Sequence, residues 1–155
     1  MEFNTQGNKK PILVYDGDCE FCKVWISRWR SITHEKVACS PYQKVADDYP
    51  DISTEQFGSA VFFFDSAGKS YSGAQAIFKT FSYAPNGKWI FDFYESSPSF
   101  AFFSEWIYKK LAENRKNFTI LTRWTWSNPF KTSTCYFSLS IFLFLLSLIY
   151  LLNLF

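Results

Sequence analysis

The sequence predicts an α/β domain with its elements in the order β-α-β, loop, β-β-α, followed by a transmembrane helix. Two apolar runs bounded by turn residues, at positions 11–15 and 59–64, are typical of buried strands. In the sequence that follows each run, apolar residues recur three and four positions apart, which is the spacing of a helix with one buried face. Residues 135–155 carry no charged side chain and are rich in Leu, Ile and Phe, which favours a membrane span.

The first half of the domain predicts a parallel β-α-β unit. Residues 11–15 should form a strand buried on both faces, and Asp16-Gly17 should end it. Asp18 is the expected N-cap of the helix that follows. The apolar stripe of that helix consists of Cys22, Trp25, Ile26 and Trp29. Residues 36–40 then predict a second strand, parallel to the first through a right-handed crossover.

The second half predicts an antiparallel hairpin and a short helix. Residues 47–58 contain several turn-forming residues and are expected to be mostly loop, with at most one helical turn. The central strand at 59–64 is joined by a turn ending at Gly68 to an antiparallel strand at 69–72. The apolar side chains of the helix after it are Ala74, Ile77, Phe78 and Phe81.

The rest of the domain predicts an irregular segment and a longer helix. Residues 82–98 contain two prolines and Asn86-Gly87, which favours irregular structure. Residues 99–113 have the periodicity of a helix. The expected core face of this helix consists of Phe103, Trp106, Ile107 and Leu111.

Composition restricts the class of protein. The chain has 155 residues, of which 48% are hydrophobic and 22% aromatic, so about one domain with an ordinary core is expected. A net charge of +2 is too small to indicate nucleic-acid binding. Basic residues outnumber acidic ones from Lys109 onward, and such an excess before an apolar run favours a membrane surface. Residues 1–10 are polar, so no secretory signal peptide is expected.

The residues that indicate chemistry lie between the first strand and the first helix. Cys19 and Cys22 are three positions apart, so their sulfurs can meet on one face of the helix start. A helix N-terminus stabilises negative charge, and the thiolate is the form of cysteine that attacks disulfides. A Cys-x-x-Cys pair near a β-α-β unit therefore indicates thiol-disulfide exchange. Cys19, nearer to the helix end, is the expected attacking thiol, and Cys22 would resolve the mixed disulfide.

The segment Tyr15-Asp16-Gly17-Asp18-Cys19-Glu20-Phe21-Cys22 resembles the signature of the thiol-disulfide oxidoreductase DCC family, named for its Asp-Cys-x-x-Cys core. The resemblance covers residues 11–118. It implies a thioredoxin-like fold and a redox activity. It also implies that the pair Asn114-Arg115 holds the C-terminal helix to the core. Thioredoxins place a cis-proline before the third strand, whereas this chain has Gly58-Ser59-Ala60 there, a departure that affects the expected docking of substrates.

Acidic residues around the cysteines bear on the direction of electron flow. Asp16, Asp18 and Glu20 surround Cys19, and their carboxylates oppose the formation of another anion. We therefore expect the pair to be a reductant rather than a strong oxidant. Asp16 or Asp18 would serve either as a proton acceptor during exchange or as an N-cap or turn residue.

A zinc site is the alternative use of the cysteines. Its realistic ligands are Cys19, Cys22, Cys39 and His34, and the chain has no second Cys-x-x-Cys. No metal site is therefore predicted. Cys39 is expected to be a buried small residue at a strand end, and His34 a residue at a helix end.

Two functions follow as alternatives. The first is a membrane-tethered thiol-disulfide oxidoreductase that exchanges electrons with a dithiol or disulfide of a protein or small thiol and needs no organic cofactor. The second is a non-catalytic membrane-anchored adaptor or metal-binding module on a thioredoxin-like scaffold.

The expected domain organisation has four parts. They are a disordered lead at 1–10, the thioredoxin-like domain at 11–118, a basic and aromatic connector at 119–134, and the transmembrane helix at 135–155. Because Arg123 and Lys131 precede the apolar run, the redox domain is expected to face the cytoplasm.

Overall fold

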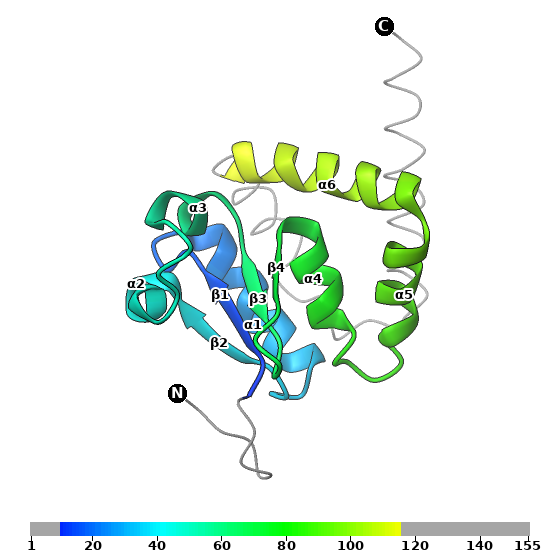
Figure 1. Cartoon of the computed structure of the whole chain (residues 1–155), viewed down its shortest axis with the longest axis horizontal. Coiled ribbons are helices and arrows are strands. Elements are labelled where there is room, and N and C mark those ends of the chain that lie inside the picture. The colour runs from blue at the N-terminus through cyan, green and yellow to red at the C-terminus, as the bar shows by residue number, and fades with distance from the viewer. Residues whose placement is uncertain (1–9, 116–155) are drawn as a thin grey trace, which may run out of the picture. The chain divides into compact units, whose positions relative to one another are not determined.

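Four strands form one mixed sheet in the computed structural model, which describes residues 10–115 (Figure 1). The strands are β1 Ile12–Tyr15, β2 Ala38–Pro41, β3 Phe62–Phe64 and β4 Ser70–Ser72. Their order is β2-β1-β3-β4, with β1 and β2 parallel and the other neighbours antiparallel. The predicted parallel unit and antiparallel hairpin are confirmed, and the sheet is consistent with a thioredoxin-like domain.

The sheet is covered by helices on both faces (Figure 1). The helices are α1 Glu20–Ile32, α2 Tyr42–Val45, the 3-10 helix η1 Ala46–Asp48, α3 Thr54–Ser59, α4 Gly73–Phe81, α5 Lys88–Ser96 and α6 Pro98–Glu113. On one face, Leu13 and Phe63 are fully buried under α1, α4 and α5. On the other face, Val14 and Phe64 pack against Phe57 from the short helix α3. The predicted burial of the first strand on both sides is confirmed by the zero exposure of Leu13 and Val14.

The segments at 47–58 and 82–98 are more helical than expected. The expected loop at 47–58 includes α3, which begins with a capping box: Ser53 Oγ accepts from the Gln56 N–H, and Gln56 Oε1 accepts from the Ser53 N–H. The expected irregular segment at 82–98 includes α5, so that prediction is wrong. Its turn-forming residues bound the helix instead of breaking it: Asn86 has a φ of 57° just before α5 begins.

Helix α6 exposes side chains that were expected to lie in the core. Phe103, Trp106 and Ile107 were expected in the core, but they are 54%, 52% and 37% exposed. Polar contacts orient the helix the other way. The carboxylate of Glu105 accepts hydrogen bonds from the backbone N–H groups at the start of α4, and Tyr108 accepts one from Val61.

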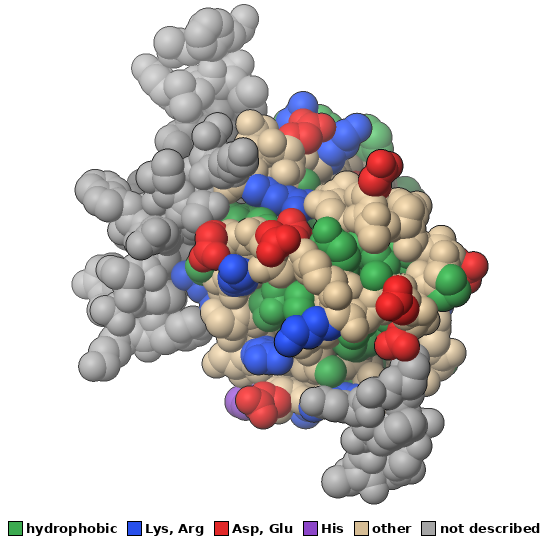
Figure 2. All heavy atoms as spheres, turned by 90° about the vertical axis from the view of Figure 1, so that its left-hand side faces the viewer, with side chains coloured by type: hydrophobic (Ala, Val, Ile, Leu, Met, Phe, Trp, Pro, Cys, Tyr) green, Lys and Arg blue, Asp and Glu red, His purple; other side chains and the backbone are tan. Residues whose placement is uncertain are grey.

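On the face shown in Figure 2, the described residues form no large area with charge of one sign. Figure 2 shows acidic and basic side chains interspersed with apolar ones over one face of the described part.

Within residues 10–115 no helix is long and apolar enough to cross a membrane. The predicted connector at 119–134 and transmembrane helix at 135–155 lie outside the described residues, as does most of the predicted lead.

Candidate active site

The turn between β1 and α1 is held in place by one glutamine. Gln43 of α2 donates from Nε2 to Asp16 Oδ1 at 3.1 Å and to Asp18 Oδ2 at 3.3 Å. Its Oε1 accepts from the backbone N–H of Gly17 at 3.1 Å. The amide thus uses both its donor and its acceptor ends on the turn that leads into the cysteines.

Glycine at position 17 is required by close packing. A Cβ added there would lie 2.7 Å from Pro41 Cβ and 2.9 Å from Gln43 Oε1. The approach brings the turn after β1 against the end of β2. It follows from the parallel pairing of the two strands, which brings Tyr15 opposite Pro41.

The N-cap of α1 is Cys19, so the predicted N-cap at Asp18 is wrong. Cys19 Sγ accepts from the backbone N–H of Cys22 at 3.2 Å. Asp18 instead donates its backbone N–H to Asp16 Oδ1 at 3.0 Å, a local turn stabilised by the aspartate side chain. A sulfur can replace the usual oxygen at the cap because the first turn has free N–H groups that favour a negative partner.

The two sulfurs of the motif are close together. The Cys22 thiol donates to Cys19 Sγ over 2.7 Å, so only a small movement separates this pair from a disulfide. Both side chains are partly exposed rather than sealed in the core. The expected meeting of the two sulfurs at the helix start is confirmed.

The surroundings of Cys22 favour its protonated form. Burial, together with the neighbouring Cys19 sulfur, raises the pKa of Cys22 to about 12. Cys22 therefore keeps its proton at neutral pH and acts as a hydrogen-bond donor. A negative charge on Cys19 would receive that thiol and the backbone N–H of Cys22 as donors, and it would lie at the positive end of α1.

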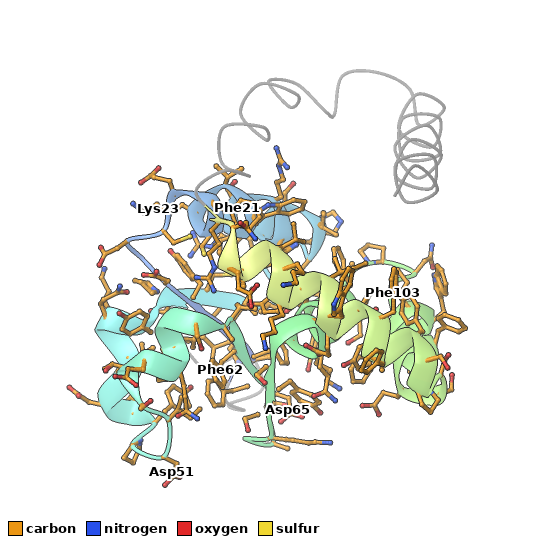
Figure 3. All side chains as sticks on the ribbon, turned by 90° about the horizontal axis from the view of Figure 1, so that it is seen from above. Phe21, Lys23, Asp51, Phe62, Asp65 and Phe103 are labelled. Carbon is orange, nitrogen blue, oxygen red and sulfur yellow. The ribbon has the colours of Figure 1, made fainter. Side chains whose placement is uncertain are left out.

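Arg115 completes the site from the far end of the domain. Its Nη1 lies 3.9 Å from Cys22 Sγ and donates to the carbonyl of Gly58 at 3.1 Å. Its Nη2 donates to the carbonyl of Ser59. Figures 1 and 3 show the C-terminal end of α6 reaching the start of α1. The expected tie between the end of this helix and the core is therefore present for Arg115, whereas Asn114 donates to Lys110 within its own helix.

Cys39 and His34 have other surroundings. Cys39 lies on β2 opposite Leu13, and burial raises the pKa of its thiol. His34 is exposed just after α1, with a φ of 50°. Residues 10–115 contain no group of three or more His, Cys, Asp or Glu side chains placed to hold a metal ion.

Sequence reasoning missed Gln43 and Tyr108. Gln43 follows the strand parallel to β1, and parallel strands end at the same edge of a sheet, so its position near the cysteines was open to prediction. Tyr108 gave no such signal. Its hydroxyl accepts the backbone N–H of Val61 at 2.9 Å, a contact that depends on how α6 crosses the domain.

These features define a class: an α/β domain with a dithiol at the junction of its first strand and helix. The sequence model of the DCC1-like thiol-disulfide oxidoreductase family matches residues 13–121, and the chain belongs to this family. Comparison with curated proteins and with solved structures gives no significant match.

Proposed function

We propose that this protein is a membrane-tethered thiol-disulfide oxidoreductase in which Cys19 is the attacking thiol and Cys22 the resolving thiol. Family membership supplies the reaction class. The observation that carries the assignment of roles is the hydrogen bond from the Cys22 thiol to Cys19 Sγ. It supports Cys19 as the sulfur that bears charge, and the raised pKa of Cys22 supports Cys22 as the sulfur that waits protonated.

The exchange proceeds in two balanced steps. The Cys19 thiolate attacks one sulfur of a substrate disulfide, which forms a mixed disulfide and releases the other substrate sulfur as a thiolate that takes up a proton. Cys22 then loses its proton, and its sulfur attacks Cys19 Sγ. This step releases the second substrate thiol and leaves a Cys19–Cys22 disulfide. Two electrons and two protons pass to the substrate.

Asp16 and Asp18 fit a structural role better than a catalytic one. Their carboxylates accept hydrogen bonds from Gln43, and Asp16 also accepts the backbone N–H of Asp18. A proton acceptor for exchange needs to lie within hydrogen-bond reach of the reacting sulfur. Both carboxylates bind the side chain of Gln43, and Asp16 also binds the backbone of the turn, which supports a role in holding the turn against α2.

The experiment that tests the roles is the trapping of a mixed disulfide. A Cys22→Ser variant of the full chain should accumulate a mixed disulfide through Cys19 when treated with a peptide disulfide, visible by mass spectrometry. Cys19→Ser is the matched control and should trap none. If Cys22→Ser traps nothing while the wild-type pair remains reduced, the catalytic assignment fails and a tethered adaptor takes its place.

The pair is further proposed to act as a reductant. The pKa of Cys22 is raised by burial, by the Cys19 sulfur and by the Asp16 carboxylate, which disfavours a thiolate at Cys22, and a less stabilised thiolate makes the disulfide easier to retain. Equilibration with glutathione buffers should give a potential nearer to thioredoxin's roughly −270 mV than to the roughly −120 mV of strong dithiol oxidants. A value at the oxidising end contradicts this direction.

Membrane tethering rests on the sequence of residues 135–155, which is long enough as a helix to cross a bilayer. We propose that the redox domain faces the cytoplasm, because Arg123 and Lys131 precede the apolar run. The full chain should stay in membranes after alkaline carbonate extraction. A membrane-impermeant thiol reagent should label Cys19 only after permeabilisation. Release of the chain by carbonate contradicts membrane tethering, and labelling of Cys19 in intact cells contradicts the cytoplasmic orientation.

A further inference from the structure

An apolar groove lies directly beside the resolving sulfur. Its volume is about 240 Å³, and Cys22 itself forms part of its wall. The groove is bounded by α1, α4, α6 and the residues just before β3, and Figure 3 places Phe21, another of its lining residues, next to the C-terminal end of α6. Its principal apolar side chains are Phe21, Trp25, Trp29, Ile77, Phe81 and Leu111.

The size of the groove limits what it can hold. Sites for drug-sized ligands measure about 300–1,000 Å³, so this groove is too small for a typical cofactor. An apolar cavity of about 150 Å³ is known to hold benzene. A volume of about 240 Å³ therefore suits one aromatic or branched aliphatic side chain.

The groove lies close to the sulfur that would form the mixed disulfide with a substrate. Cys22 Sγ is 2.7 Å from Cys19 Sγ, to which a substrate sulfur becomes attached. Consecutive residues of a peptide are about 3.8 Å apart at Cα, so a side chain next to the substrate cysteine reaches the groove while the mixed disulfide exists.

We propose that this groove is a specificity subsite that binds an aromatic or branched aliphatic side chain adjacent to the reacting cysteine of a polypeptide disulfide. This inference rests on the proposed thiol-disulfide exchange. The substrate class is therefore a peptide or protein disulfide with apolar flanking residues, rather than glutathione disulfide, which has no apolar side chain beside its cysteine.

The test compares two matched substrates on the wild-type full chain in its dithiol form. The peptides differ only in the residues that flank their cysteine, Phe-Cys-Phe or Ala-Cys-Ala, and each is supplied as its symmetrical disulfide. The second-order rate constant should be about tenfold higher for the Phe peptide, equivalent to about 1.4 kcal/mol. Equal rates overturn the subsite and leave the redox function standing, whereas no reduction of either peptide overturns the redox function itself.

A filled groove gives an independent check. Ala112→Leu adds apolar volume to the wall from α6 with little change in helix propensity, and it should bring the ratio of the two rate constants close to one. Lys110→Leu introduces the same side chain on the exposed face of the same helix and should keep the preference. A preference that survives in a folded Ala112→Leu variant contradicts the proposal. The wild-type comparison remains decisive if that variant does not fold.

Discussion

The guanidinium of Arg115 lies 3.9 Å from Cys22 Sγ, although the two residues are 93 positions apart in the chain. The same side chain binds the carbonyls of Gly58 and Ser59. It therefore connects three separate parts of the fold, namely the end of α6, the end of α3 and the first turn of α1. Its positive charge also lowers the pKa of Cys22, against the larger effect of burial.

Replacing Arg115 by methionine should slow the resolving step. Without the cation, the pKa of Cys22 rises further above its present value of about 12, and each further unit reduces the thiolate fraction about tenfold. The lifetime of the mixed disulfide on Cys19, measured by quenched-flow mass spectrometry, should lengthen about tenfold for each unit by which the pKa of Cys22 rises. Arg115→Lys keeps the charge and should restore part of the rate. Unchanged lifetimes in both variants would show that the contact has no role in resolution.

Alkaline pH should destabilise the reduced protein through Cys22. Its pKa in the folded state is raised to about 12 from an ordinary value of about 9, so the folded state holds this proton more tightly than the unfolded chain. The stabilisation is complete below pH 9 and is lost as the pH rises toward 12. Urea unfolding under reducing conditions should show a steeper loss of unfolding free energy between pH 8 and 10.5 in the wild type than in Cys22→Ala. Tyrosines titrate in both proteins, so parallel curves would contradict the prediction.

Gly17→Ala should distort the turn that precedes the cysteines. The added Cβ would meet Pro41 Cβ at 2.7 Å, and neither carbon belongs to a flexible chain end. Overpacking of this kind costs about 1–3 kcal/mol, measurable as a lower free energy of unfolding and a slower trapping reaction at Cys19. Gly58→Ala is the matched control, because a Cβ there has no atom within 4 Å, and it should be neutral or stabilising by up to about 1 kcal/mol. Equal effects at the two glycines would rule out the packing explanation.

Tyr108→Phe should destabilise the domain by about 1–3 kcal/mol, because it leaves the Val61 N–H without its acceptor. Chemical denaturation of the full chain measures this loss. Phe103→Leu on the exposed face of α6 should change stability by no more than about 0.5 kcal/mol. A Tyr108→Phe variant as stable as the wild type would mean that water replaces the hydroxyl at no cost.

Periodicity predicted the elements whose apolar residues face the sheet. The first strand, the helix after it and the hairpin at β3 and β4 were found this way, because hydrophobic burial determines where they lie. The Cys19–Cys22 contact followed from helix geometry alone. These features are local, or depend on neighbours close in sequence.

Features that depend on long-range polar contacts were not predicted. The face that α6 buries is chosen by Glu105, Tyr108 and Arg115, and the more apolar face with Phe103 and Trp106 is left outside. Hydrophobicity alone therefore placed Phe103, Trp106 and Ile107 on the wrong side of the helix, whereas Leu111 is half-buried and lines the groove beside Cys22. The N-cap at Cys19 was missed for a related reason, since sulfur is not among the usual capping groups.

Most backbone hydrogen-bonding groups just before β3 already have partners within the domain, so few remain to bind an incoming peptide. Gly58 and Ser59 give their carbonyls to Arg115, Val61 gives its N–H to Tyr108, and the Val61 carbonyl accepts the N–H of Gly73. An incoming peptide cannot extend the sheet along this strip while α6 stays in place. For the proposed peptide substrates, recognition would then depend on side chains, so that peptides of equal backbone shape but different sequence would react at different rates.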